Sequence, residues 1–287
     1  MHGVHFEAGL AVSTRVLVTG AAGNFGRKAI AALIELDDVV AIGVDGGPAG
    51  DLGPETELIH ADLSTYDCSW ARRFDDVDVV LHLAADPRPN ATSQEVLRSN
   101  LDLSHHVIRA AEEHGVKRFV FASSNWVLGG YRFTRNTLTP ATPPRPVNPY
   151  GFSKLATERA GAAVTGRSGM SFLALRLGWC QPGDNLPGPH MAFGRWGQEL
   201  WLSNDDWRQV VHQTCTMPVA GFAIVNVMSD NAGMRWDLSD ADRLLRFRPL
   251  SRHVPRISVR GYLTDSAARL RDSVAPANGT PRFGARW

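Results

Sequence analysis

The sequence predicts an α/β fold, a doubly wound parallel sheet with helices on both faces. Short apolar runs rich in β-branched residues alternate with helical patterns between residues 15 and 177. Most of these runs end at glycine or at a polar residue, as buried strands do. Strands that alternate with helices form parallel sheets, and such sheets bind ligands beyond the carboxyl ends of their strands. We therefore expect one cleft along that edge of the sheet.

Strands and helices can be assigned along most of this part of the chain. Strands are predicted at residues 15–19, 39–44, 58–60, 77–84, 119–122 and 172–177. Apolar residues at helical spacing predict helices at 27–36, 94–114 and 150–164, the second of them closed by Gly115. Five prolines between residues 140 and 149 predict an irregular loop. After Gly178 the alternation weakens, and Pro, Trp and Gly become dense.

Composition excludes several classes of protein. The 287 residues carry 30 Lys and Arg against 29 Asp and Glu, a net charge of +1, which argues against a nucleic-acid-binding protein. No apolar run reaches the roughly 18 residues that a membrane span needs. Three cysteines without close pairing, and a start without a cationic leader region, favour a cytoplasmic protein. The ten histidines show no metal-ligand spacing, so no metal site is expected.

The glycine-rich loop at residues 19–26, TGAAGNFG, is the first chemical signal. Gly20 permits the tight turn, Gly23 lets the backbone approach a pyrophosphate, and Gly26 lets the helix pack closely on the strand. Asp45, at the end of the second strand, could accept hydrogen bonds from both ribose hydroxyls and would repel a 2′-phosphate. The alternative is an ordinary βαβ turn with a surface aspartate. We expect a bound dinucleotide, NAD rather than NADP.

This loop defines the expected domain organisation. Residues 14–178 should form a Rossmann-like NAD-binding domain, and residues 179–272 mainly a substrate-binding lobe interleaved with the sheet. Residues 1–13 and 273–287 are expected to be tails. Asp62 and Leu63, after the third strand, could reach the adenine of the cofactor, but Asp62 could equally be the N-cap of a helix.

Tyr150 and Lys154 form the second signal. They lie four residues apart at the start of a predicted helix, so their side chains share one face. A neighbouring ammonium group favours the tyrosinate and lowers the tyrosine pKa, which makes the phenol usable in proton transfer. Ser124, at the end of a predicted strand, could donate a hydrogen bond to the same substrate oxygen. In isolation such a pair on a helix has no catalytic meaning, but beside the glycine loop and the serine it does.

With these motifs the chain resembles the extended short-chain dehydrogenase/reductases, and among them the uronate dehydrogenases. The resemblance covers about residues 14–250 and rests on five further stretches. They are HLAA at 82–85, FASSN at 121–125, PYGFSK at 149–154, RLG at 176–178 and WLSNDD at 201–206.

The resemblance implies a role for each matching residue. Tyr150 would be the general base, Lys154 would hold the nicotinamide ribose, and Ser124 would orient the reacting oxygen. Leu83, Ala84 and Ala85 would line the cofactor channel, and Asn24 and Phe25 would lie at the pyrophosphate. A homodimer through the long helices is expected on the same grounds.

Several positions differ from the uronate dehydrogenases. Trp126 stands where they usually have His, and Trp179 where they have Ser. The Arg that binds the substrate carboxylate has no clear match, although Arg88 and Arg195 are candidate anion partners. Large aromatic side chains beside Ser124 and Asn125 favour a flatter or more apolar substrate.

The leading hypothesis is an NAD-dependent oxidoreductase that removes hydride from a secondary alcohol or hemiacetal. The first candidate substrate is a uronic acid or related sugar, oxidised at C1 to a lactone. One alternative is an epimerase acting on a sugar or nucleotide sugar, which keeps its NAD bound. Another is a redox-silent NAD-binding regulatory protein, which would have no use for Ser124, Tyr150 and Lys154 together.

Overall fold

The computed structural model describes residues 13–46, 52, 56–256, 263 and 266. Its centre is a seven-stranded sheet in the order β3-β2-β1-β4-β5-β6-β7, and every neighbouring pair is parallel. The strands are β1 (Thr14–Thr19), β2 (Val39–Asp45), β3 (Glu57–His60), β4 (Val79–His82), β5 (Arg118–Ser124), β6 (Ser171–Leu177) and β7 (Phe222–Val227). The predicted doubly wound α/β fold is confirmed.

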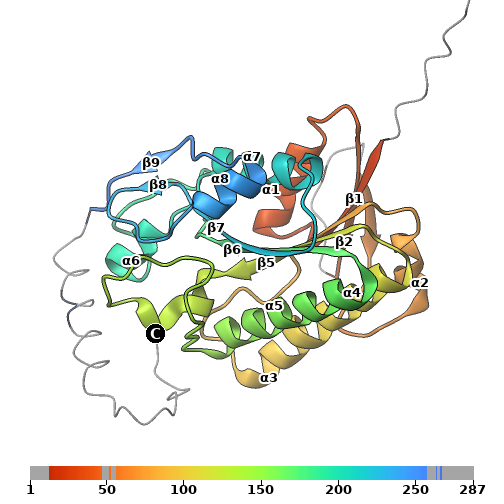
Figure 1. Cartoon of the computed structure of the whole chain (residues 1–287), viewed down its shortest axis with the longest axis horizontal. Coiled ribbons are helices and arrows are strands. Elements are labelled where there is room, and N and C mark those ends of the chain that lie inside the picture. Colours follow the sequence, from red (N-terminus) through yellow and green to blue (C-terminus); the bar gives the residue numbers. More distant parts are fainter. Residues whose placement is uncertain (1–12, 47–51, 53–55, 257–262, 264–265, 267–287) are drawn as a thin grey trace, which may run out of the picture.

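Helices cover both faces of the sheet (Figure 1). On one side lie α1 (Asn24–Leu33), α7 (Asn204–Thr216) and α8 (Ser239–Leu245). On the other lie α2 (Cys68–Ala71), α4 (Leu103–Glu113) and α5 (Pro149–Ser168). In β1, Val16 and Val18 pack toward the first group and Leu17 toward the second. Because both faces are buried, the strands read as continuous apolar runs.

Some element boundaries differ from the sequence-based prediction. The helix expected at 94–114 consists of α3 (Ser93–Val96), a π-helical segment Leu97–Asp102 and α4. Strand β7 and helices α7 and α8 were not predicted, because the Trp- and Gly-rich stretch after Gly178 obscures the alternation that β7 resumes. The fifth strand, predicted at 119–122, extends over Arg118–Ser124, and the two serines lie at its C-terminal end as expected.

A smaller hydrophobic cluster lies beside the carboxyl edge of the sheet. Leu128 and Leu138 meet there with Trp196 of α6 (Gly194–Glu199) and with Trp236. The short strands β8 (Asp230–Asn231) and β9 (Arg252–His253) pair in the same part of the molecule (Figure 1). The predicted tails, except residue 13, lie outside the described residues, as does most of 257–272.

A buried ion pair fixes α5 against the sheet. Glu158 of α5 accepts hydrogen bonds from Arg176 Nε and Nη2 of β6, at 3.0 and 2.9 Å, and from Ser123 Oγ of β5, at 2.6 Å. The charged side chains are 1% and 2% exposed. Removal of one partner from such a pair leaves an unpaired charge in a region with little solvent.

We therefore expect Glu158→Ala to lower the free energy of unfolding by about 3–5 kcal/mol in urea denaturation. The matched control is Glu112→Ala. It removes the exposed pair between α4 and Arg167 of α5, which solvent screens, and should change stability far less. Equal losses in the two variants would contradict the role assigned to the buried pair.

Candidate active site

A cavity of about 550 Å³ opens beyond the carboxyl ends of the central strands. Eight of the predicted cofactor-binding residues line it: Gly20, Gly23, Asp45, Asp62, Leu63, Leu83, Ala84 and Ala85. They come from four separate segments of the chain that end or begin at the same sheet edge. The topology therefore joins residues that the sequence could only associate by motif.

The glycine loop packs too tightly for side chains at two positions. A Cβ on Gly20, whose φ is +72°, would lie 2.7 Å from the Ala84 nitrogen. A Cβ on Gly26 would lie 2.1 Å from the Gly20 carbonyl oxygen. These contacts hold the start of α1 against the loop that follows β4.

The first turn of α1 is open to an anion. Gly23 is its N-cap, with no side-chain cap, and the first turn carries no acidic residue. The backbone N–H groups of such a helix end, with the positive end of the helix dipole, favour a phosphate group. Together with the lining glycines, this arrangement fits the pyrophosphate of a dinucleotide.

Asp45 and Asp62 both line this cavity. Asp45 Oδ2 accepts a hydrogen bond from the Ala22 nitrogen at 2.9 Å, so the carboxylate also braces the loop. Asp62 Oδ1 accepts from the Ser64 nitrogen within a turn, and α2 is capped by Asp67 instead. The interpretation of Asp62 as a helix N-cap is therefore wrong.

The side chains of Asn24 and Phe25 point away from the loop. Asn24 Nδ2 donates to the carbonyl of Cys180 at 2.8 Å, and the Phe25 ring packs edge-on against Trp207, with centroids 4.9 Å apart. Of these two residues, only the backbone remains for a pyrophosphate.

Ser124, Tyr150 and Lys154 come together where the carboxyl end of β5 meets the N-terminal part of α5. Asn148 caps α5 by accepting from the Gly151 nitrogen at 2.7 Å. A Cβ on Gly151 would lie 2.4 Å from the Trp126 carbonyl oxygen, so the helix start lies directly against the segment after Ser124. Ser124 hydrogen-bonds the Tyr150 phenol, and Lys154 Nζ lies 5.6 Å from the centre of the Tyr150 ring.

Burial controls the ionisation of this group. It raises the pKa of Tyr150 to about 12, and the charge of Asp86 adds to the increase, while the Ser124 hydrogen bond opposes it. Burial also lowers the pKa of Lys154 to about 7. The predicted lowering of the Tyr150 pKa is thus not found, because burial has the largest effect and a lysine whose pKa is about 7 is uncharged at the pH where the phenol titrates.

Aromatic side chains form the wall next to Ser124. Trp126 and Trp179 both pack on Phe193, with ring centroids 5.1 and 5.9 Å apart. Phe193 precedes α6 and has a φ of +65°. No periodic pattern in the sequence indicates where this residue lies. Asn125, 2% exposed, donates to the carbonyls of Arg176 and Leu177 and so ties β5 to β6.

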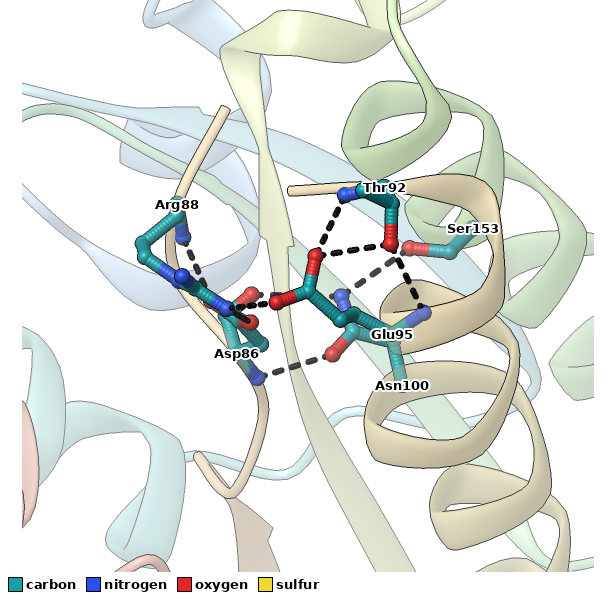
Figure 2. Close-up of polar contacts among 6 residues, drawn as sticks. All are labelled: Asp86, Arg88, Thr92, Glu95, Asn100 and Ser153. Carbon is teal, nitrogen blue, oxygen red and sulfur yellow. Dashed lines mark hydrogen bonds and ion pairs between the residues drawn. The ribbon is translucent and has the colours of Figure 1, made fainter. Parts of the chain in front are cut away.

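A hydrogen-bonded chain links the loop after β4 to the start of α5 (Figure 2). Asn100, in the π-helical segment, accepts from the Asp86 nitrogen at 2.8 Å and donates to the Asp86 carbonyl at 3.2 Å and to Ser153 Oγ at 3.3 Å. Ser153 Oγ in turn donates to the Tyr150 carbonyl at 2.8 Å. Sequence reasoning missed Asn100 and Asp86, although Asp86 directly follows the HLAA run.

Comparison with known proteins confirms the predicted family. Residues 16–180 match the NAD dependent epimerase/dehydratase family. The chain is 31% identical to the uronate dehydrogenase of Pseudomonas syringae pv. tomato over 80% of each chain. It is 31% identical to the L-arabinose 1-dehydrogenase (NAD(P)(+)) of Haloferax volcanii, over 82% of this chain and 96% of the other.

A solved structure is similar over nearly the whole chain. It is a mutant of uronate dehydrogenase from Agrobacterium tumefaciens complexed with NAD, 26% identical, with a TM-score of 0.72 over 94% of this chain and 92% of that one. The predictions of NAD as cofactor and of a dehydrogenase are confirmed. In the part of the chain that the structure describes, no helix is long and apolar enough to cross a membrane, and no three potential metal ligands cluster.

The low pKa of Lys154 predicts a pH-dependent stability. Between pH 7 and pH 10.5 the unfolded chain binds a proton that the folded chain does not, so stability should rise with pH through this lysine. Compared with Lys154→Met, the NAD-free wild type should gain up to about 1.4 kcal/mol of unfolding free energy per pH unit, measured in urea at pH 7, 8 and 9.

Lys117→Met is the control for this measurement, because Lys117 is exposed and its ion pair with Asp78 raises its pKa. The difference in unfolding free energy between Lys117→Met and wild type should not change with pH over the same range. Parallel pH profiles for wild type and Lys154→Met would show that the buried ammonium group is not destabilised.

Proposed function

Since the chain belongs to the NAD dependent epimerase/dehydratase family, we propose that its site oxidises the anomeric hydroxyl of a cyclic sugar to a lactone. It is an NAD-dependent dehydrogenase of the extended short-chain type. The observation that carries the proposal is the convergence of Ser124, Tyr150 and Lys154 beside the Asp86 end of the cavity. The relatives named above act on a uronate or on L-arabinose, and both are sugars.

Different lining residues would bind different parts of the cofactor. The loop from Gly20 to Gly26 would hold the pyrophosphate through backbone N–H groups, and Asp45 would bind the adenosine ribose hydroxyls. Asp62 and Leu63 would border the adenine. Leu83, Ala84 and Ala85 would line the channel toward the nicotinamide. NAD, when bound, accepts the hydride from the substrate carbon.

Tyr150 takes the hydroxyl proton as that carbon is oxidised. Ser124 donates a hydrogen bond to the reacting oxygen, which fixes the O–H group toward the phenolate. Lys154 would bind the nicotinamide ribose hydroxyls, and its positive charge, when present, stabilises the tyrosinate. Because burial raises the pKa of Tyr150 to about 12, the tyrosinate is scarce at neutral pH, and turnover should rise with pH.

The lobe around Trp196 and Trp236 would close over the sugar. Trp126 and Trp179 would supply the flat surface on which a sugar ring packs. Asn125 stands beside Ser124 with both amide hydrogens held by β6 carbonyls, so the polar groups at this point are fixed.

We expect a homodimer built on the exposed face of the long helices. Leu97 and Phe152, which belong to these helical segments, are 52% and 58% exposed and would supply apolar area to such an interface. A cytoplasmic location fits the three cysteines, Cys68, Cys180 and Cys215, which are all free thiols.

Tyr150→Phe tests the proposal. We expect it to reduce sugar-dependent NADH formation by about 10²–10⁴-fold while NAD binding, measured by calorimetry, remains. Tyr131→Phe is the control, because the Tyr131 hydroxyl only donates to the Pro143 carbonyl. Unchanged turnover in Tyr150→Phe would remove the phenol from the mechanism, whereas no NADH formation by the wild type with any sugar would favour the redox-silent alternative.

A further inference from the structure

Asp86 carries a negative charge into the site. It follows Leu83, Ala84 and Ala85 along the cavity wall, and its side chain is only 12% exposed. Asn100 hydrogen-bonds both the backbone nitrogen and the backbone carbonyl of Asp86, and it also bonds Ser153 near the start of α5 (Figure 2). The carboxylate is therefore fixed relative to Tyr150.

Arg88 donates hydrogen bonds to two carboxylates, those of Asp86 and Glu95. Arg88 donates to Asp86 Oδ1 through its backbone nitrogen and Nε, at 3.0 and 2.9 Å, and to Oδ2 through Nη2 at 2.5 Å. The same Nη2 donates to Glu95 Oε1 at 2.8 Å (Figure 2). Glu95 is fixed in turn by the hydroxyl and backbone nitrogen of Thr92.

The group as a whole is negative. Arg88 lowers the pKa of Asp86, and the Thr92 hydrogen bonds lower that of Glu95 to about 2, so both acids are ionised at neutral pH. One guanidinium cannot neutralise two carboxylates. The excess charge reaches the reacting group, since Asp86 raises the pKa of the Tyr150 phenol.

The two candidate anion partners are both engaged. Arg88 is held in the group just described, and Arg195 Nη1 lies 3.7 Å from the buried carboxylate of Glu199. Arg132, beside the aromatic wall, donates to the Phe193 carbonyl at 3.3 Å. At Arg88 and Arg195 an incoming carboxylate or phosphate would have to compete with a protein carboxylate, and at Arg88 it would also approach Asp86.

We propose, on the basis of the function proposed above, that Asp86 is a specificity-determining residue and that the site takes an uncharged aldose in preference to a uronate or a sugar phosphate. A neutral sugar meets no repulsion at the fixed carboxylate. An anionic sugar meets a like charge that Arg88, which is shared with Glu95, offsets only in part, and close like charges are disfavoured.

The test compares kcat/KM with NAD for L-arabinose and D-galactose against D-galacturonate, D-glucuronate and glucose 6-phosphate. Wild type should favour the neutral sugars by about tenfold or more. Asp86→Asn, which keeps the shape and removes the charge, should shift the ratio toward the anionic sugars by about tenfold, chiefly through KM. A wild-type preference for a uronate, or an unchanged ratio in Asp86→Asn, would overturn the inference.

Glu95→Gln is the matched control. It removes one negative charge from the same arginine, but its carboxylate is 43% exposed and belongs to the outer side of the group. Because this variant leaves Arg88 to Asp86 alone, the ratio should shift in the same direction as in Asp86→Asn but by no more than about threefold, since solvent screens the Glu95 charge. A shift as large as that of Asp86→Asn would show that net charge on Arg88, not the place of Asp86, sets the preference.

The charge preference can also be measured without turnover. If no sugar gives NADH, the proposed function fails, and binding of a neutral aldonolactone and of its anionic glucarolactone counterpart to the NADH-loaded protein is compared by calorimetry. Tighter binding of the neutral lactone in wild type, lost in Asp86→Asn, supports the inference on its own. Tighter binding of the anionic lactone would overturn it.

Discussion

The position of α5 on the sheet is the constraint on which the site depends. Three contacts set it: the buried pair of Glu158 with Arg176, the close approach of Gly151 to the Trp126 carbonyl, and the link from Ser153 to Asn100. Each joins α5 to a different part of the molecule. Because Tyr150 and Lys154 lie in the first two turns of this helix, a shift of α5 would separate them from Ser124.

The same packing that positions these side chains also changes their chemistry. Burial raises the pKa of the phenol and lowers that of the ammonium group, so the fold favours the neutral forms of both groups more than water does. The Asp86 carboxylate lies in the wall of the cavity, and the Trp126 ring packs on Phe193 next to Ser124. Shape and charge in this cleft thus come from loops, while the reacting groups come from the regular elements.

Sequence reasoning succeeded where local pattern determines structure. The first six strands, the glycine loop and the Tyr150–Lys154 spacing are local signals, and the parallel topology follows from their alternation. It failed where long-range packing decides, as for Phe193, whose place beside Trp126 depends on an irregular segment. The predicted direction of the Tyr150 pKa shift was also wrong, because spacing on a helix identifies a neighbouring residue but not how deeply the phenol is buried.

We propose that this cleft oxidises a sugar at C1 with net reduction of NAD. The direct measurement is turnover of an aldose that carries deuterium at C1, with the label followed by mass spectrometry. We predict that the NADH that accumulates carries the deuterium and that the sugar product is a lactone. The rate should be lower than with the unlabelled sugar. Recovery of the label in an epimerised sugar, with no accumulation of NADH, would contradict this reaction. The formation of NADH that carries no deuterium would contradict it as well.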